Sequence, residues 1–253
     1  QEEAEAPRLA AEAPAAWGTP EIEPNDAQRE GLENLAWLRE HGVQKAAVIA
    51  ATGVGKTYLA AFDFKASGSK RLLFIAHRET ILHAARESFR AVLGNPRFGG
   101  MLGGGRCMIS TGDSLFAMVQ TLGKEDVLSS FSPDYFDYIV MDEFHHGMAP
   151  SYRRVLEYFK PSFFLGLTAT PERMDGRDVL ALCDYHVGYE VRLLEAVDRG
   201  WLSPFQYFAI YDETDYSLIS WRGTGYDEVE LEEALSTDTR TAVVARNLKR
   251  FLP

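Results

Sequence analysis

The sequence predicts an α/β fold, a three-layer sandwich in which helices cover both faces of a mostly parallel sheet. From residue 24 to about residue 200, short apolar runs alternate with longer amphipathic segments. The apolar runs are rich in Ile, Val, Leu and Phe, which is typical of strands that helices bury on both faces. One of these runs leads directly into a glycine-rich loop, which predicts a ligand site at a strand end.

Each element follows from its own pattern. Five apolar runs predict strands, at residues 46–51, 71–76, 107–111, 138–142 and 163–168. Five amphipathic segments predict helices, at residues 26–40, 56–66, 79–93, 152–159 and 195–199. The glycine run 99–106 predicts either a loop that approaches a phosphate or a mobile surface loop. After Gly200 the pattern changes, and PFQYFAIYDETDYS predicts one more strand and a polar loop, with a charged helix over 227–252.

These patterns divide the chain into three parts. Residues 1–23 form a flexible acidic and Ala-rich leader, 24–200 the α/β domain, and 201–253 an extension with its final helix. The net charge of −11 argues against binding nucleic acid through bulk positive potential, although a local groove can still be basic. Cys107 and Cys183 are too far apart in sequence for a metal-ligand motif, and no apolar run is long enough to cross a membrane. We therefore expect a cytoplasmic protein without a membrane partner.

Residues 50–57 read AATGVGKT, which matches the phosphate-binding pattern G-x-x-x-x-G-K-S/T except that Ala50 replaces the first glycine. Glycines let successive backbone N–H groups turn toward an anion, and the start of the following helix adds partial positive charge. Lys56 would reach the β- and γ-phosphates of a nucleotide, and Thr57 would hold Mg²⁺. The alternative is a glycine turn that binds no ligand. The candidate nucleotide contacts of this loop are Thr52, Gly53, Val54, Gly55, Lys56, Thr57 and Tyr58.

A second candidate site element is the carboxylate pair in FDYIVMDEFHH. Asp142 and Glu143 follow the predicted strand at its carboxyl end, the edge where ligands bind in such sheets. Asp142 would help to hold Mg²⁺, and Glu143 would orient and deprotonate the attacking water. An isolated Asp-Glu pair is usually a solvated turn, so the catalytic interpretation depends on the phosphate loop.

GVGKT, DEFH and LGLTATPER, in this order, resemble the motifs of the superfamily 2 helicases and translocases, the DEAD/DEAH-box-like proteins. The later phrase LLEAVDRGWLSPFQY is similar to the restriction-enzyme and excision-repair branch. EPNDAQ resembles the adenine-reading element, FIAHRETIL motif Ia and FAMVQTL motif Ib. The resemblance covers the chain from about residue 22 to its end, and it implies the RecA-like form of the P-loop NTPase sandwich.

The resemblance also implies roles for single residues. Gln28 would read the adenine edge, and His145 would link the catalytic strand to Thr168 and Thr170, which relay the state of the γ-phosphate. The two threonines could instead cap the turn at Pro171. The residues implied to contact the nucleic-acid backbone are His77, Arg78, Gln120 and Thr121. The His77–Arg78 pair could also be simply exposed.

Two departures from the family pattern affect these expectations. Met118 stands where motif Ib has a small hydroxyl residue, which puts one backbone contact in doubt. About 80 residues follow Thr170, too few for the second RecA-like lobe whose arginines complete such ATP sites. Because an arginine finger contributes roughly 10³–10⁵ in turnover, we expect this chain alone to bind ATP, hydrolyse it feebly and unwind no duplex. The last helix would bridge toward the missing lobe.

The sequence therefore predicts the N-terminal ATP-binding motor lobe of an ATP-dependent helicase or translocase, an ATP hydrolase that uses ATP and Mg²⁺. Its expected partners are nucleic acid, with DNA favoured over RNA, and a second RecA-like lobe. A GTPase-like switch is one alternative, but we find no guanine-reading NKxD element. The other is a nucleotide-sensing docking module for a nuclease or repair partner, which the sequence leaves open.

Overall fold

The structure, a computed structural model, describes residues 22–103, 106–108, 114–171, 178–211, 214–223 and 225–251. Residues 1–21, which make up most of the predicted leader, lie outside this part of the chain. The chain divides into two compact units, Gln1–Ser203 and Pro204–Pro253, and each unit is described by itself. No helix in the described residues is both long enough and apolar enough to cross a bilayer.

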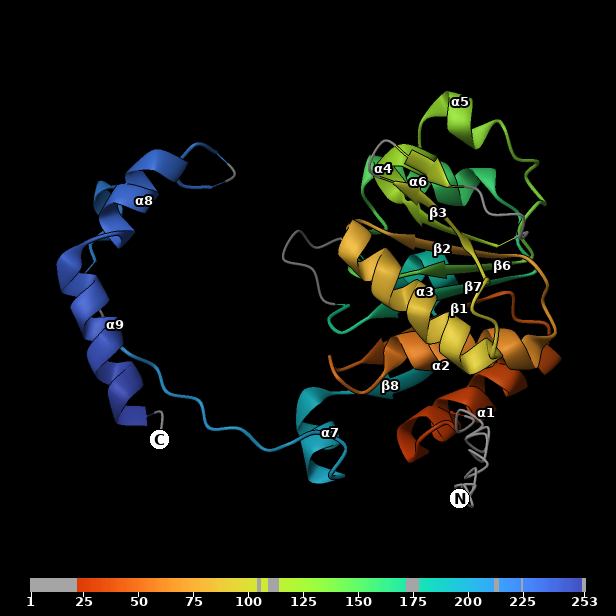
Figure 1. The fold of residues 1–253 in the computed structure, drawn as a ribbon, viewed down its shortest axis with the longest axis horizontal. Helices are drawn as coiled ribbons and strands as arrows, with labels where there is room; N and C mark the ends of the chain where they lie inside the picture. Colours follow the sequence, from red (N-terminus) through yellow and green to blue (C-terminus); the bar gives the residue numbers. More distant parts are fainter. Residues whose placement is uncertain are drawn as a thin grey trace, which may run out of the picture. The chain divides into compact units, whose positions relative to one another are not determined.

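The first unit contains an eight-stranded sheet with the order β4-β3-β5-β2-β6-β7-β1-β8 (Figure 1). Neighbouring strands pair in parallel, except that β3 and β4 are antiparallel. The strands are β1 (Lys45–Ala50), β2 (Leu72–Ala76), β3 (Gly100–Gly103), β4 (Arg106–Met108), β5 (Leu115–Met118), β6 (Tyr138–Met141), β7 (Phe163–Thr168) and β8 (Val187–Val191).

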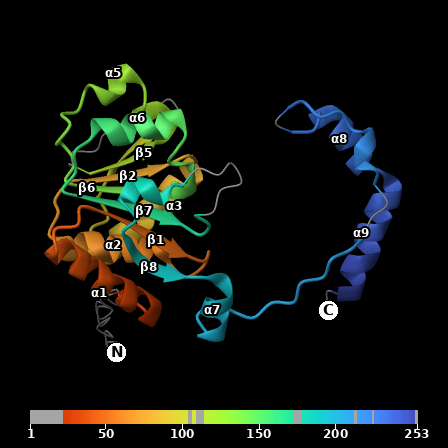
Figure 2. The ribbon, with the colours of Figure 1, turned by 180° about the vertical axis from the view of Figure 1, so that it is seen from behind.

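Helices cover both faces of this sheet (Figures 1 and 2). On one face lie α1 (Asp26–Glu40), α2 (Lys56–Ser67) and α3 (Glu79–Leu93), with the short α7 (Leu193–Asp198) following β8. On the other lie α4 (Val119–Leu122), α5 (Glu125–Leu128), α6 (Pro150–Tyr158) and the 3-10 turns η1 (Phe144–His146) and η2 (Leu180–Cys183). The predicted three-layer α/β sandwich with a mostly parallel sheet is confirmed.

Alternation along each strand produces two apolar cores. In β2, for example, Phe74 packs in the core under α1–α3, whereas Leu73 and Ile75 pack in the core under α4–α6. All residues of β2, β6 and β7 are buried, as expected for parallel strands covered on both faces. Burial of this kind stabilises the fold by about 25 cal/mol per Å² of apolar surface removed from water.

The sequence predicts no strand at β3, β5 or β8, and all three form. The glycine run 99–106 contains β3, so its interpretation as a phosphate-approaching or mobile loop is wrong for residues 100–103. Gly99 has a φ of +73°, and a side chain there would collide with the Phe116 ring. The glycine thus allows β3 to begin close to β5.

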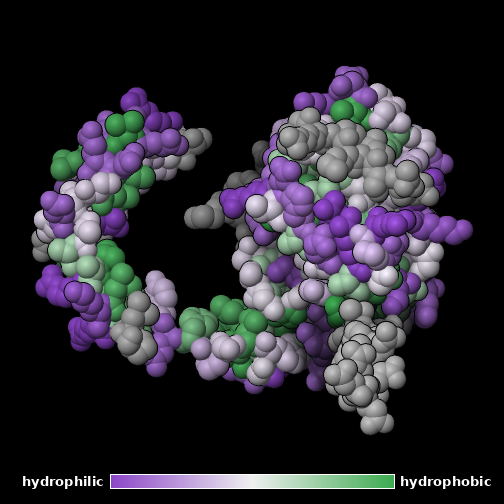
Figure 3. Space-filling view, viewed as in Figure 1, coloured by the Kyte–Doolittle hydropathy of each residue, from purple (hydrophilic) through white to green (hydrophobic). Residues whose placement is uncertain are grey.

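The second unit contains η3 (Tyr216–Leu218), α8 (Glu228–Leu235) and α9 (Asp238–Phe251). The predicted single helix over 227–252 is wrong, because Thr237 accepts a hydrogen bond from the Arg240 N–H and starts a new helix. The predicted strand after Pro204 is also wrong, since the described residues 204–211 are irregular and pair with no strand. Several large apolar side chains of this unit are exposed, including Phe205, Tyr207 and Leu218. Green hydrophobic residues lie beside purple hydrophilic ones on the surface (Figure 3).

Candidate nucleotide site

The candidate residues follow the carboxyl ends of five strands that are neighbours in the sheet, β5-β2-β6-β7-β1. The phosphate loop follows β1, the carboxylate pair follows β6, and Thr168 ends β7. His77 and Arg78 follow β2, and Gln120 and Thr121 lie in α4 after β5. The topology therefore brings every strand-end candidate to one edge of the sheet, where ligands bind in open α/β folds.

The loop between β1 and α2 has the backbone that an anion site requires. Gly53 and Gly55 have φ values of 96° and 95°, which L side chains rarely adopt. Val54, between them, is buried in the apolar core and anchors the loop, while Thr52 and Gly53 are exposed. α2 then begins at Lys56, so the free N–H groups of its first turn are available at the loop.

Lys56 is half-buried and held against its own loop. Its Nζ donates a hydrogen bond to the carbonyl oxygen of Ala50 at 2.8 Å. Burial lowers the pKa of Lys56, and the nearby carboxylates of Asp142 and Glu143 oppose this shift. The ammonium group therefore lies within the electrostatic reach of both acids. The neighbouring Tyr58 is half-buried and packs against the apolar core.

The two carboxylates differ in their surroundings. Asp142 is 9% exposed, and burial is the main cause that raises its pKa. Glu143 is more exposed and has a left-handed backbone with φ of 51°, and its N–H donates to Asp142 Oδ1 at 3.0 Å. Two adjacent carboxylates thus differ in burial, one buried and one half-exposed. The arrangement suits two separate roles.

The oxygen donors present fit a magnesium ion. Thr57 offers a hydroxyl and Asp142 a carboxylate, and Mg²⁺ is usually bound by one or two protein oxygens together with substrate phosphates and waters. Among the described residues, no three His, Cys, Asp or Glu side chains form a group that could hold a metal by themselves. Any metal at this edge would thus depend on the oxygens of a bound nucleotide.

His145 joins the carboxylate pair to the end of β7. Its Nδ1 lies 3.3 Å from Glu143 Oε2 and 3.2 Å from Thr168 Oγ1. Thr168 is fully buried, and its hydroxyl also accepts a hydrogen bond from the Thr170 N–H at 3.2 Å. The contacts form a continuous path from the catalytic candidate to Thr170.

Gln28 lies beside the phosphate loop. Asn25 caps α1, and the Gln28 side-chain oxygen accepts from the Asn25 N–H at 2.9 Å in a reciprocal capping box. Its Nε2 donates to the carbonyl of Gly55 at 3.2 Å. A primary amide has a second N–H and a second lone pair, so these contacts leave capacity for an adenine edge.

Two of the candidate nucleic-acid residues are in contact. Gln120 Nε2 donates to the backbone carbonyl of His77 at 3.4 Å, and Arg78 is exposed at the start of α3. The His77 ring lies 5.4 Å from that of His146, which belongs to the same turn as His145. His146 belongs to none of the sequence motifs, and only the folded turn brings its ring close to the residue that follows β2.

Tyr152 is a second residue that the motifs do not reveal. It lies in α6 and is 3% exposed, and Asp142 and Glu143 add to the effect of burial in raising its pKa. Its hydroxyl has no hydrogen-bond partner in the described part of the chain. The amphipathic spacing of α6 predicts that Tyr152 and Val155 face inward, but it cannot predict that the hydroxyl lies near the carboxylates.

The sequence profile of a known family, the type III restriction enzyme res subunit, matches residues 21–173. The match covers more than half of the chain and includes the phosphate loop, the carboxylate pair and the β7 end. The chain belongs to this family. The predicted resemblance to superfamily 2 helicases is confirmed with it.

Several known proteins are similar to this chain in sequence or in fold. The type I restriction enzyme EcoAI endonuclease subunit of Escherichia coli is 28% identical over 257 residues, covering 90% of this chain and 31% of that protein. The putative ATP-dependent helicase IRC3 of Saccharomyces cerevisiae is 26% identical over 245 residues, covering 90% and 34%. A DNA-bound structure of the ATP-dependent type ISP restriction-modification enzyme LlaBIII shares the fold, with a TM-score of 0.53 at 15% identity over 71% of this chain and 16% of that one. This chain spans about a third of the length of the two curated relatives.

Proposed function

We propose that this chain is the ATP-binding motor lobe of an ATP-dependent DNA helicase or translocase, in which ATP hydrolysis drives movement along nucleic acid. One observation carries the proposal. A phosphate-loop lysine, a buried aspartate, an exposed glutamate and a histidine–threonine pair converge at one sheet edge. Family membership supports the same function, because its relatives include a helicase and restriction-enzyme subunits.

The binding step follows from the loop. The N–H groups around Gly53–Thr57 would surround the triphosphate, with Lys56 beside the β- and γ-phosphates. Lys56 is already held at the loop by the Ala50 carbonyl, so little side-chain freedom is lost on binding. Thr57 and Asp142 would hold Mg²⁺, which when bound neutralises charge on the phosphates. Gln28, beside Gly55, would contact the adenine.

The chemical step would use Glu143 as the base. Its carboxylate lies 3.3 Å from His145 Nδ1, which orients it and keeps it at the edge of the site. As the water oxygen bonds to the γ-phosphorus, its proton would pass to Glu143, while the bond between the γ-phosphorus and the β–γ bridging oxygen breaks and ADP leaves. Through its contact with Thr168, His145 would then transmit the change in the state of the γ-phosphate to Thr168 and Thr170.

The partners extend beyond the nucleotide. His77, Arg78, Gln120 and Thr121 would contact the phosphates of a nucleic-acid strand, which positions the strand without reading its sequence. DNA is favoured because one of the two relatives is a restriction-enzyme subunit and the LlaBIII structure is that of a DNA-bound enzyme. A second RecA-like lobe would complete the site, and the cytoplasm is the proposed location.

Nucleotide titration tests the ATP assignment. We expect calorimetric titration of the chain with a non-hydrolysable ATP analogue and Mg²⁺ to show one site, which the Lys56→Ala variant loses. The matching GTP analogue serves as the comparison, because the chain carries no guanine-reading motif. Equal or stronger binding of the GTP analogue would favour the switch-like alternative.

The second candidate function is a nucleotide-sensing docking module for a nuclease or repair partner. The similarity to restriction-enzyme subunits supports this candidate. ATP hydrolysis measured with and without DNA in the full-length protein separates the two. Stimulation by DNA supports the motor. ATP binding without stimulation, together with a stable protein partner, supports docking.

A further inference from the structure

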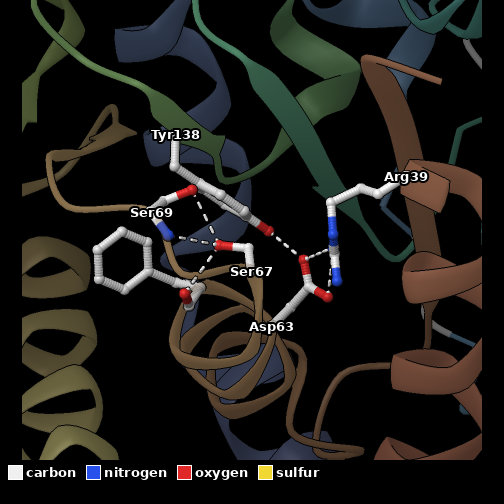
Figure 4. A network of polar contacts seen from close by, with 6 residues as sticks. Arg39, Asp63, Ser67, Ser69 and Tyr138 are labelled. Carbon is white, nitrogen blue, oxygen red and sulfur yellow. Dashed lines mark hydrogen bonds and ion pairs between the residues drawn. The ribbon is translucent and has the colours of Figure 1, made fainter. Parts of the chain in front are cut away.

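A buried polar network of Arg39, Asp63 and Tyr138 joins elements that also carry the candidate site (Figure 4). Asp63 is fully buried in α2, and the two atoms of its carboxylate lie 2.6 and 2.5 Å from Arg39 Nη1. The Tyr138 hydroxyl donates to Oδ2 of the same carboxylate. Burial and the Asp63 charge raise the pKa of Tyr138 well above its usual value, so the hydroxyl keeps the proton that it donates.

This network touches four elements, and each of them carries part of the site at its other end. Arg39 is in the last turn of α1, which begins near Gln28, and Asp63 is two turns along α2 from Lys56. Tyr138 begins β6, which leads to Asp142.

The fourth element is β7. The Arg39 guanidinium lies 5.2 Å from the ring centroid of Phe163, the first residue of β7, which ends at Thr168. Phe163 also pairs with Tyr138 in the sheet, so the network members contact one another across β6 and β7. Arg39, Asp63 and Tyr138 thus connect the last turn of α1 and the middle of α2 with the starts of β6 and β7.

Stability alone is a poor explanation for this arrangement. Moving a carboxylate and a guanidinium out of water costs several kcal/mol for each ion, and apolar residues of similar volume often replace a buried ion pair without loss of stability. Apolar contacts are non-directional and let elements slide, whereas charge-assisted hydrogen bonds fix both distance and angle. The network therefore offers geometric definition that an apolar cluster would lack.

We propose that Arg39, Asp63 and Tyr138 form a positioning network that fixes α1, α2, β6 and β7 relative to one another, and so fixes the spacing between Lys56 and the Asp142–Glu143 pair. Asp63 is its central member. The inference rests on the proposed ATP-binding function and deepens it. The network lies near the residues that it would position. Asp63 is about 10 Å along the helix from Lys56, and Tyr138 is about 13 Å along the strand from Asp142.

The test replaces the network with apolar residues of similar size, in the triple variant Arg39→Met, Asp63→Leu, Tyr138→Phe. We expect the thermal midpoint to stay close to that of the wild type. We expect the affinity for a non-hydrolysable ATP analogue with Mg²⁺ to fall by roughly tenfold or more, because Lys56 and the carboxylate pair would no longer be held at the spacing that the site needs. A stable triple variant that binds the analogue as tightly as the wild type would overturn the proposal.

Three further variants keep the outcome decisive. Arg153→Gln with Glu157→Gln removes an exposed ion pair of α6 and should change neither stability nor affinity. If the triple variant fails to fold, Tyr138→Phe, which deletes one hydroxyl, decides the question: a folded variant with weakened analogue binding supports the proposal, and unchanged binding overturns it. The wild type and Lys56→Ala separate the two proposals. A wild type that binds no analogue, or a Lys56→Ala variant that binds it as tightly as the wild type, refutes the ATP site itself rather than the network.

Discussion

The Nδ1 atom of His145 lies 3.2 Å from the Oγ1 atom of Thr168, although 23 positions separate the two residues. The contact arises because β6 and β7 are neighbours in the sheet and pair Met141 with Gly166, so that their carboxyl ends meet. The same imidazole nitrogen is 3.3 Å from Glu143. One side chain therefore contacts both the proposed base and the end of the next strand.

The first prediction concerns this contact. Thr168→Val keeps the volume of the buried side chain but removes the hydroxyl that meets His145 and the Thr170 N–H. We expect ATP binding to persist and DNA stimulation of ATP hydrolysis in the full-length protein to fall by roughly tenfold or more, since about 1.4 kcal/mol of coupling corresponds to tenfold. Steady-state hydrolysis with and without DNA measures this. Thr168→Ser, which keeps the hydroxyl, should behave like the wild type, and full stimulation in the valine variant would contradict the relay.

The second prediction separates binding from chemistry. Lys56→Ala removes the cation held at the Ala50 carbonyl, and we expect loss of both nucleotide binding and hydrolysis in the full-length protein. Glu143→Gln keeps the shape of the side chain but removes its basicity, so nucleotide binding should persist while turnover falls by about 10² or more. Titration and steady-state kinetics measure the two effects. Normal hydrolysis by the glutamine variant would show that another group is the base.

The third prediction concerns Phe144, the first residue of the η1 turn after β6. Its ring is fully buried, and a β-carbon at Gly166 would lie 2.6 Å from its Cγ atom. We expect Gly166→Ala to destabilise the fold by about 1–3 kcal/mol, the usual cost of overpacking. Combining it with Phe144→Leu should recover part of this loss, because the smaller side chain makes room. Denaturant unfolding of both single variants and the double variant measures the coupling, and strictly additive effects would show that the two side chains do not compete for space.

The fourth prediction concerns alkaline pH. Burial raises the pKa of the Cys183 thiol to about 12, whereas the unfolded thiol ionises at about 8.5. Below about pH 8.5 the thiol is protonated in both states and has no effect on the pH dependence. Above it only the unfolded state loses the proton, so stability should fall by about 1.4 kcal/mol per pH unit toward pH 12. Cys183→Ala should remove this part of the slope in denaturant unfolding, and identical slopes in the two proteins would contradict the assignment.

Long amphipathic segments are the part of the fold that the sequence predicts best. The expected helices 26–40 and 79–93 and the strand 163–168 have the observed bounds, because their periodic patterns extend over whole elements. β3 and β5 have four residues each and β8 has five, and no predicted strand falls on any of them. Whether residues 204–211 form a strand depends on a pairing partner, which a local pattern cannot reveal.

Only part of the candidate site and of the network beside it can be predicted from the sequence. Motif spacing is enough to suggest that Lys56 and Asp142 meet, because both follow strands of one parallel sheet. Asp63 is different, since a single acidic residue in FDFK is typical of a solvated helix face. Its burial depends on Arg39 and Tyr138, which are 24 and 75 positions away. Such a contact arises only from the tertiary fold.

The most direct test of the account is a crystal structure of the chain with a non-hydrolysable ATP analogue and Mg²⁺. We expect the triphosphate against the N–H groups around Gly53–Thr57, with the ion between Thr57 and Asp142 and Glu143 facing the γ-phosphate. An empty loop at saturating analogue, or a nucleotide bound elsewhere on the molecule, would contradict it.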